Sequence, residues 1–309
     1  MSVLADIRDK LQDTEGMIAR LERDLATNPH LPSILLEIKS LEKRRKKYEE
    51  EFTVATASLG IDVCAYRILP ETEHVRVAGL ASALIDYQSL VSVFYDAVKR
   101  GTTKQRSRIS AESYEESAFE FGYAFAGSVG FVFTVPNERT LFDNSPLDQS
   151  IQMIFDLSRS DQPSQILAFA HQVGPGPISA MYKWAASHVK HGFSVDIQWK
   201  RGSDLKMQAL IQQSEFARLQ AAIAQTSEET TVETTLTGTL LGADVGKRTF
   251  RLKPDAGDDI FGFCGEVIDE SHTVELPKRY TATLRVTTKL HYATDQEDIS
   301  YALLRLEPA

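Results

Sequence analysis

A heptad repeat of apolar residues near the start of the chain constrains its fold more than any other feature of the sequence. The repeat consists of residues seven positions apart and of others three positions after them: Leu4, Ile7, Leu11, Ile18, Leu21 and Leu25. This spacing places a narrow apolar stripe along one side of a helix, which is buried when two helices wind together. The first segment is therefore expected to be a helix of the coiled-coil type.

A second stretch with the same repeat follows a break that contains two prolines, Pro29 and Pro32. Proline lacks a backbone N–H and interrupts a helix, so the two stretches cannot form one continuous helix. The repeat resumes at Ile34, Ile38 and Leu41. We therefore predict an antiparallel helical hairpin (a coiled coil) as a first domain over residues 1–56.

The hairpin needs a covering surface, because two helices alone bury too little apolar area to be stable. The nine repeat residues are predicted to form an oligomerisation seam with a second copy, or to pack on the rest of the chain. The basic run 39–47 on the second helix is interpreted as a solvated face, with contact to nucleic acid or an acidic partner as the alternative.

Residues 57–226 are predicted to form a central mixed α/β domain. Alternating residues indicate a strand over 61–69, and a 3.6-residue period indicates a long helix over 80–100. Further elements are expected along the domain: strands over 117–126, 129–136 and 193–199, and helices over 147–158, 164–173, 178–191 and 206–226. A polar linker over 227–230 is expected to lead into the next domain.

The strand predicted over 117–126 carries an aromatic residue at every second position: Phe119, Phe121, Tyr123 and Phe125. Alternation would place all four on one face of the sheet. We interpret this face as part of the core, and a stacking platform for nucleic-acid bases is the alternative.

Residues 227–309 are predicted to form a small five-stranded β-barrel of the OB or SH3-like type. Strands are expected over 232–242, 247–254, 259–265, 279–290 and 299–306, with a longer insertion after the third. From Val232 onward the sequence holds 9 Lys and Arg against 13 Asp and Glu. A surface that follows a phosphate backbone normally has a positive excess, so contact with protein is the favoured interpretation.

The composition further limits the range of functions and cellular locations that are expected. The net charge of −9 disfavours a surface dominated by phosphate binding, and only two cysteines, Cys64 and Cys264, occur. Few cysteines indicate a reducing compartment, so a cytoplasmic location is expected, with both thiols as small buried apolar groups. The N-terminus has no signal peptide pattern, and no apolar run reaches the length that crosses a bilayer, so membrane insertion is not expected.

Motifs for common chemistries are missing from the sequence: no phosphate-binding loop, HExxH, CxxC or GxSxG occurs. His188 and His191 lie three positions apart with Asp196 close behind, which would suit a metal site. No further ligand is evident from the sequence, and neutral surface or helix-capping histidines are the simpler interpretation. Asp196, Gln198 and Lys200 match the carboxylate and Gln-x-Lys pattern of restriction-type nucleases, but an upstream acidic ligand on a partner strand is missing. No catalytic residue, metal ligand or cofactor is therefore assigned.

Basic residues gather in the loop after the long helix and at the end of the strand over 193–199. They are Lys99, Arg100, Lys104, Arg106, Arg108, Lys200 and Arg201. If the two groups lie together, they would form a contact for an anionic ligand or nucleic acid. A solvated loop is the simpler interpretation.

Two segments carry a resemblance to other proteins. The segments 174–184 with Ile197-Gln198-Trp199, and Thr237-Gly238-Thr239-Leu240 with Phe250-Arg251-Leu252, resemble uncharacterised bacterial proteins with a small C-terminal barrel. The resemblance implies a bacterial, intracellular origin and no particular activity.

These features predict a non-enzymatic, oligomerising assembly or regulatory subunit of an intracellular bacterial complex, acting through protein–protein contacts as a homo-oligomer or with a partner protein. The alternative is a nucleic-acid-binding protein that uses the basic residues 99–108, with a metal-dependent nuclease as its enzymatic form.

Overall fold

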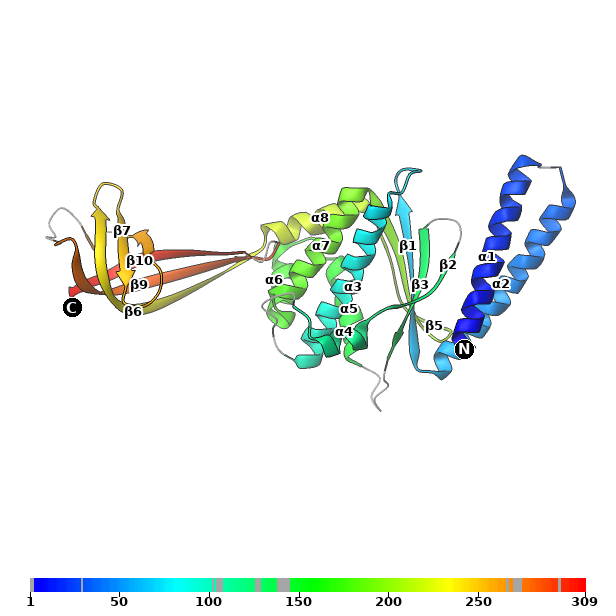
Figure 1. Cartoon of the computed structure of the whole chain (residues 1–309), viewed down its shortest axis with the longest axis horizontal. Helices are drawn as coiled ribbons and strands as arrows, with labels where there is room; N and C mark the ends of the chain where they lie inside the picture. The colour runs from blue at the N-terminus through cyan, green and yellow to red at the C-terminus, as the bar shows by residue number, and fades with distance from the viewer. Residues whose placement is uncertain are drawn as a thin grey trace. The chain divides into compact units, whose positions relative to one another are not determined.

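The computed structural model describes residues 3–28, 30–101, 103, 108–125, 129–137, 145–264, 267–268, 274–293 and 296–309. The chain divides into two compact units, Met1–Gln225 and Thr226–Ala309. Within the described residues there are eight helices and two sheets, so the chain is a mixed α/β protein with a small barrel near its C-terminus (Figure 1).

The first unit begins with the predicted pair of helices, α1 (Val3–Thr27) and α2 (Pro32–Ser58). Pro32 occupies the first turn of α2, where its missing N–H is not needed. All nine repeat residues are buried or half-buried. At the base of the pair, Ile7, Leu11 and Phe52 pack with Tyr123 and Val132 of the following sheet, so the chain itself covers this part of the apolar stripe.

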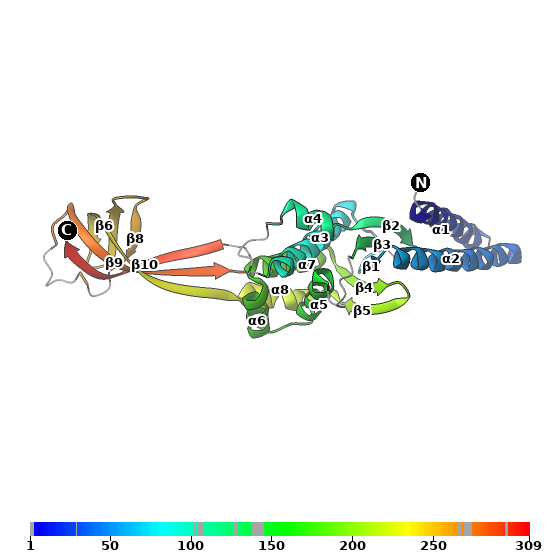
Figure 2. The same ribbon diagram turned by 90° about the horizontal axis from the view of Figure 1, so that it is seen from below.

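The sheet of the first unit has five antiparallel strands in the order β2-β3-β1-β4-β5. The strands are β1 (Ile61–Pro70), β2 (Glu120–Phe125), β3 (Val129–Pro136), β4 (Phe193–Arg201) and β5 (Asp204–Ile211). The central strand β1 alternates strictly between buried and half-buried residues. Both of its faces are covered, because the helix pair lies on one side and a helical layer on the other (Figures 1 and 2).

A helical layer covers one face of the sheet, and large side chains of both are fully buried, among them Trp184 of the layer and Tyr66 and Trp199 of the strands β1 and β4. Its helices are α3 (Val77–Arg100), α4 (Ala111–Ser117), α5 (Pro146–Ser158), α6 (Pro163–Val173), α7 (Pro175–His191) and α8 (Gln213–Gln225). Gly101 ends α3 in the left-handed conformation, and Ser145 begins α5 with a capping box, as these residue types favour.

Helix α3 is long and apolar enough to cross a bilayer by length and composition alone. Its position gives another reason for that composition, because Tyr87, Leu90 and Phe94 are fully buried within the first unit. An apolar helix of this length is expected wherever a helix is packed on several sides.

The predicted helix over 206–226 is wrong in its first part. Asp204–Ile211 is strand β5, which pairs with β4 across the turn at Gly202, and the helix begins only at Gln213. Helix-forming residues such as Lys206 and Met207 favoured the wrong prediction. Pairing with the open edge of β4 satisfies the backbone groups of this segment, and that long-range gain overrides local propensity.

The prediction of four aromatic residues on one face is also wrong. Ser117 ends α4, and the register of β2 shifts between Phe121 and Tyr123, which pair with Phe133 and Val132. The shift is a β-bulge at Gly122, and it reverses the direction of every later side chain. Phe119 therefore stacks with Phe133 on the face of the sheet that is turned to the helical layer, whereas Tyr123 packs under the helix pair.

The second unit is a closed five-stranded barrel in the order β10-β8-β7-β6-β9. The strands are β6 (Ser227–Asp244), β7 (Thr249–Pro254), β8 (Ile260–Phe263), β9 (Lys278–His291) and β10 (Gln296–Pro308). All pairs are antiparallel except β8 with β10. The predicted linker 227–230 is instead the start of β6, because its backbone pairs with the far end of β9.

Leu240, Leu252 and Leu284 lie at the centre of the barrel and are buried. Both cysteines of the chain are buried free thiols, as predicted. Burial raises the pKa of the Cys64 thiol to about 12, so it behaves as an apolar group and not as a nucleophile.

Candidate binding site on the barrel

Two exposed phenylalanines distinguish the outer face of β7 and β8. Side chains alternate on these strands, so Phe250 and Ile260 point into the barrel core and are buried. Phe261 and Phe263 point outward and remain 64% and 61% exposed. Large aromatic side chains are seldom exposed side by side without a binding role, so this face is the leading candidate site.

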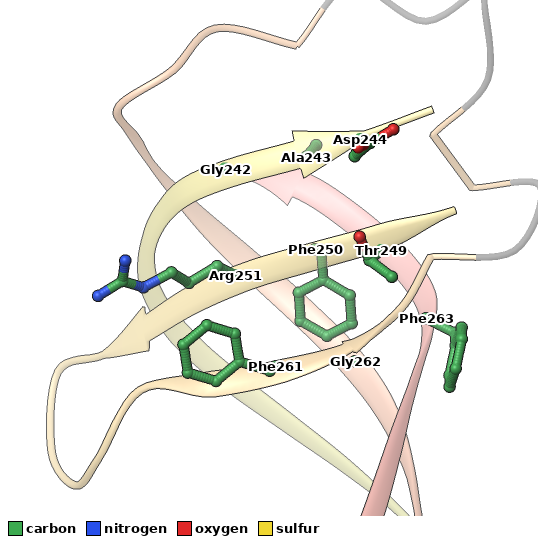
Figure 3. A pocket seen from close by; sticks show the side chains of 9 residues that line it. All are labelled: Gly242, Ala243, Asp244, Thr249, Phe250, Arg251, Phe261, Gly262 and Phe263. Carbon is green, nitrogen blue, oxygen red and sulfur yellow. The ribbon is translucent and has the colours of Figure 1, made fainter. Parts of the chain in front are cut away.

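Arg251 extends this face beside the ring of Phe261. It lies opposite Phe261 on the neighbouring strand, and its guanidinium carbon is 5.3 Å from the centre of the Phe261 ring (Figure 3). Its Nε and Nη2 also donate hydrogen bonds to Asp259 Oδ2, at 2.9 and 2.6 Å. The ion pair holds the guanidinium over the ring and neutralises its charge.

A hollow of about 570 Å³ lies between these residues and the end of β6. Gly242 forms part of its wall, and a Cβ added there would meet nothing within 4 Å. The missing side chain thus leaves open space next to Arg251 and Phe261 (Figure 3). The hollow has the size of a pocket for a small ligand or for one or two side chains.

The chemistry of this surface suits the binding of an aromatic or apolar group. Among the described lining residues, Asp244 and Arg251 are the ionisable ones, and each already has a partner. Asp244 accepts a hydrogen bond from the backbone N–H of Lys247. The surface offers aromatic faces and a flat guanidinium, which favour stacking with another aromatic or apolar group.

Three of the five described basic residues that were predicted to contact an anion are paired with acids, namely Lys99, Arg100 and Arg201. Lys99 Nζ binds Glu112 and Glu116 at 3.0 and 2.6 Å, and Arg100 lies 3.2 Å from Asp96. Their pairing reduces the positive charge available to a ligand at this end of α3. Arg108 is exposed, and Lys104 and Arg106 lie outside the described residues.

Lys200 and Arg201 lie on opposite faces of β4, because neighbouring residues of a strand point to opposite sides. Arg201 forms ion pairs with Asp62 and Asp148. Lys200 instead lines a cavity beneath the helix pair, together with Asp196 and Gln198. The structure therefore gives these two neighbours separate environments.

His188 is part of the core of the first unit. Its Nδ1 is 2.9 Å from the backbone oxygen of Trp184, and its Nε2 is 2.9 Å from the hydroxyl of Tyr66. Since the carbonyl must accept, Nδ1 carries the proton and the Tyr66 hydroxyl donates to Nε2. Burial lowers the pKa of His188 to about 4, so the ring is neutral and fully hydrogen-bonded.

Metal binding finds no support in the described part of the chain, where no group of three or more His, Cys, Asp and Glu side chains is placed to hold an ion. His191 does not join His188. It lies against Gly79 and stacks on Phe193, with the two ring centres 5.7 Å apart.

Phe261 and Phe263 are not among the candidate site residues that the sequence indicates. A signal was available, because a strand with buried Ile260 and glycine at 262 must direct both phenylalanines away from the core. The alternation identifies them only once the inward face of the strand is known. No family model, curated protein or solved structure matches this chain.

Proposed function

We propose that this protein is a non-enzymatic assembly or regulatory subunit that binds an apolar, aromatic-containing segment of a partner protein on the outer face of β7 and β8. The observation that carries the proposal is the pair of exposed rings, Phe261 and Phe263, beside a hollow. Exposed aromatic residues next to a pocket are typical of the central contacts of protein interfaces.

The strand order supports the assignment of the barrel to the OB type. Around the ring, the first three strands β6, β7 and β8 are neighbours, and the fifth strand β10 lies between the third and the fourth. The third and fifth strands are parallel, whereas all other pairs are antiparallel. Small barrels of the OB type bind ligands on the face of their second and third strands, here β7 and β8.

Charge favours a protein partner over nucleic acid. Asp259 neutralises Arg251, and the barrel as a whole carries more acidic than basic residues. Binding to a phosphate backbone depends on unpaired positive charge, which this face does not concentrate. An apolar segment requires no such charge.

The helix pair would supply the oligomerising element of this proposal as a coiled coil. Its apolar stripe is occupied within the chain at the base, and the exposed apolar residues at its far end are Leu31, Leu35 and Leu36. We propose self-association through this end of the pair. Light scattering on the full-length protein tests it: a Leu35→Lys, Leu36→Lys variant should be monomeric where the wild type is not, and a monomeric wild type would overturn it.

A peptide-display selection on the immobilised full-length protein tests the barrel face. Selected peptides should share aromatic or large aliphatic residues. Their affinity should fall at least about tenfold in a Phe261→Ala, Phe263→Ala variant, because such contacts contribute about 1.4 kcal/mol or more. Gly242→Val should fill the hollow and weaken binding without disturbing the fold.

The control for this experiment is Tyr114→Ala, which removes another exposed ring, on α4 in the first unit. Peptides that bind all variants equally would contradict the proposal.

The second candidate, single-stranded nucleic acid, rests on the guanidinium stacked against Phe261. Fluorescence anisotropy with a labelled oligothymidylate would favour it if binding weakened steeply with salt and was lost in the double variant.

A further inference from the structure

We propose that a second site, independent of the barrel, binds a small zwitterion such as a free α-amino acid. It is a cavity of about 350 Å³ between the helix pair and the face of the first sheet that carries Lys200. The cavity is within the range of small-ligand sites, which is about 300–1,000 Å³.

An incomplete buried ion pair forms one wall of the cavity. Glu15 of α1 is only 7% exposed, and its Oε1 accepts a hydrogen bond of 3.2 Å from Nη1 of Arg45 on α2. Glu15 Oε2 and Arg45 Nε are buried and have no hydrogen-bond partner. Buried polar atoms of this kind are rare, because each retains the full cost of leaving water.

The two unpartnered atoms require opposite partners. The carboxylate oxygen of Glu15 needs a donor, whereas Arg45 Nε needs an acceptor. Glu49 does not provide this acceptor, because its Oε1 lies 3.7 Å from the Arg45 nitrogen. A ligand with an ammonium and a carboxylate group would satisfy both atoms at once.

Charges of both signs also line the opposite wall. Asp196, Gln198 and Lys200 occupy alternate positions of β4 and point to the same side, and Arg67 lies opposite Asp196 on β1. Over the whole cavity, three carboxylates face three cations. A lining with no net charge disfavours a simple anion or cation and suits a molecule that carries both charges.

Apolar residues form the floor of the cavity, where Phe52, Val63 and Tyr123 bring the helix pair and the sheet together. Burial raises the pKa of Glu49 beside them, while Arg45 and Lys200 act in the opposite direction. The cavity thus combines polar groups at its walls with an apolar floor for an aliphatic side chain.

Calorimetric titration and thermal unfolding of the full-length protein with the twenty L-amino acids as probes test the proposal. At least one should bind with a Kd of about 1 mM or tighter and raise the unfolding midpoint by mass action. Acetate and methylamine, which carry one charge each, should bind at least about tenfold more weakly.

Glu15→Gln keeps the size of the side chain and should weaken binding of that amino acid by about tenfold or more. Glu112→Gln, on the exposed face of α4, is the control and should bind as the wild type does. The proposal is overturned if no amino acid binds, which would leave water as the occupant, or if the Glu15→Gln protein binds unchanged. Neither of these two results tests the proposed binding face on β7 and β8 of the barrel.

Discussion

Arg201 forms a bidentate ion pair with Asp62. Nε donates to Oδ1 at 3.0 Å and Nη2 donates to Oδ2 at 3.1 Å, and the two residues are direct partners on β4 and β1. Asp62 is 1% exposed and also accepts a hydrogen bond from Trp199 Nε1 at 3.0 Å. The neighbouring strands β1 and β4 are therefore joined by a buried carboxylate, and both of its oxygens accept hydrogen bonds.

Asp62→Ala should destabilise the first unit by about 3–5 kcal/mol, because it leaves Arg201 and the Trp199 N–H without their main acceptor. Denaturant unfolding followed by tryptophan fluorescence measures this loss. Both tryptophans of the chain, Trp184 and Trp199, belong to the first unit, so the signal does not report on the barrel.

Asp156→Ala is the matched control, because Asp156 pairs with Arg159 on an exposed part of α5. Its loss should cost less than about 1 kcal/mol. Equal effects of the two substitutions would contradict the assigned importance of the buried pair.

His188 should make the first unit less stable in mild acid. Its pKa is lowered to about 4 by burial, compared with about 6.5 in the unfolded chain. The unfolded state thus binds a proton first as the pH falls, and stability present above pH 6.5 is lost between there and pH 4. The expected loss at pH 5 is about 2 kcal/mol relative to pH 7.5.

Unfolding of the wild type and a His188→Gln variant at both pH values measures this effect. The variant should lose most of the pH dependence over that range. His74→Gln, which replaces an exposed histidine, should retain it. A variant at position 188 with unchanged pH dependence would show that another group is responsible.

Two glycine-to-alanine substitutions should have opposite effects. Gly16 lies inside α1, and an added Cβ would meet nothing within 4 Å, so Gly16→Ala should stabilise the first unit by about 0.5–1 kcal/mol. At Gly130 a Cβ would lie 2.3 Å from the ring of Phe125. Gly130→Ala must displace that ring and should be destabilising by about 1–3 kcal/mol. Denaturation midpoints of the two proteins test the difference in sign.

Neighbouring phenylalanines of the barrel should differ in their importance for stability. Phe250 is buried in the barrel core, so Phe250→Ala should cost about 3–5 kcal/mol. Phe261→Ala removes an exposed ring and should cost less than about 1 kcal/mol. An unfolding transition seen by circular dichroism but not by tryptophan fluorescence reports on the barrel, which contains no tryptophan. Similar losses would indicate that Phe261 stabilises the fold, and would weaken its assignment to binding.

The sequence predicted the helices and strands whose residue pattern depends only on positions close together in the chain. The heptad positions and the two prolines located α1 and α2, and the long apolar period with Gly101 located α3. Turn residues located most strands of the barrel. Residues such as Gly101 and Ser145 act within one or two turns of the backbone, so their effect is visible without knowledge of the fold.

The candidate sites depended on residues that meet only in the folded chain. Glu15 and Arg45 are 30 positions apart, and the strand that faces them begins at Phe193. Likewise, the exposure of Phe261 follows from which face of β8 is turned to the barrel core. Sequence periodicity alone identifies neither relationship.

By itself, the sequence determined the helix pair, the order of most elements and the presence of a small barrel, because periodicity and turn chemistry are properties of neighbouring residues. The tertiary structure alone decided that Asp204–Ile211 is a strand, that the bulge at Gly122 divides the aromatic residues between two faces, and that Glu15 and Arg45 border a cavity. The physical reason is that strand pairing and burial are settled by distant partners, whose contribution exceeds the local preferences of the chain.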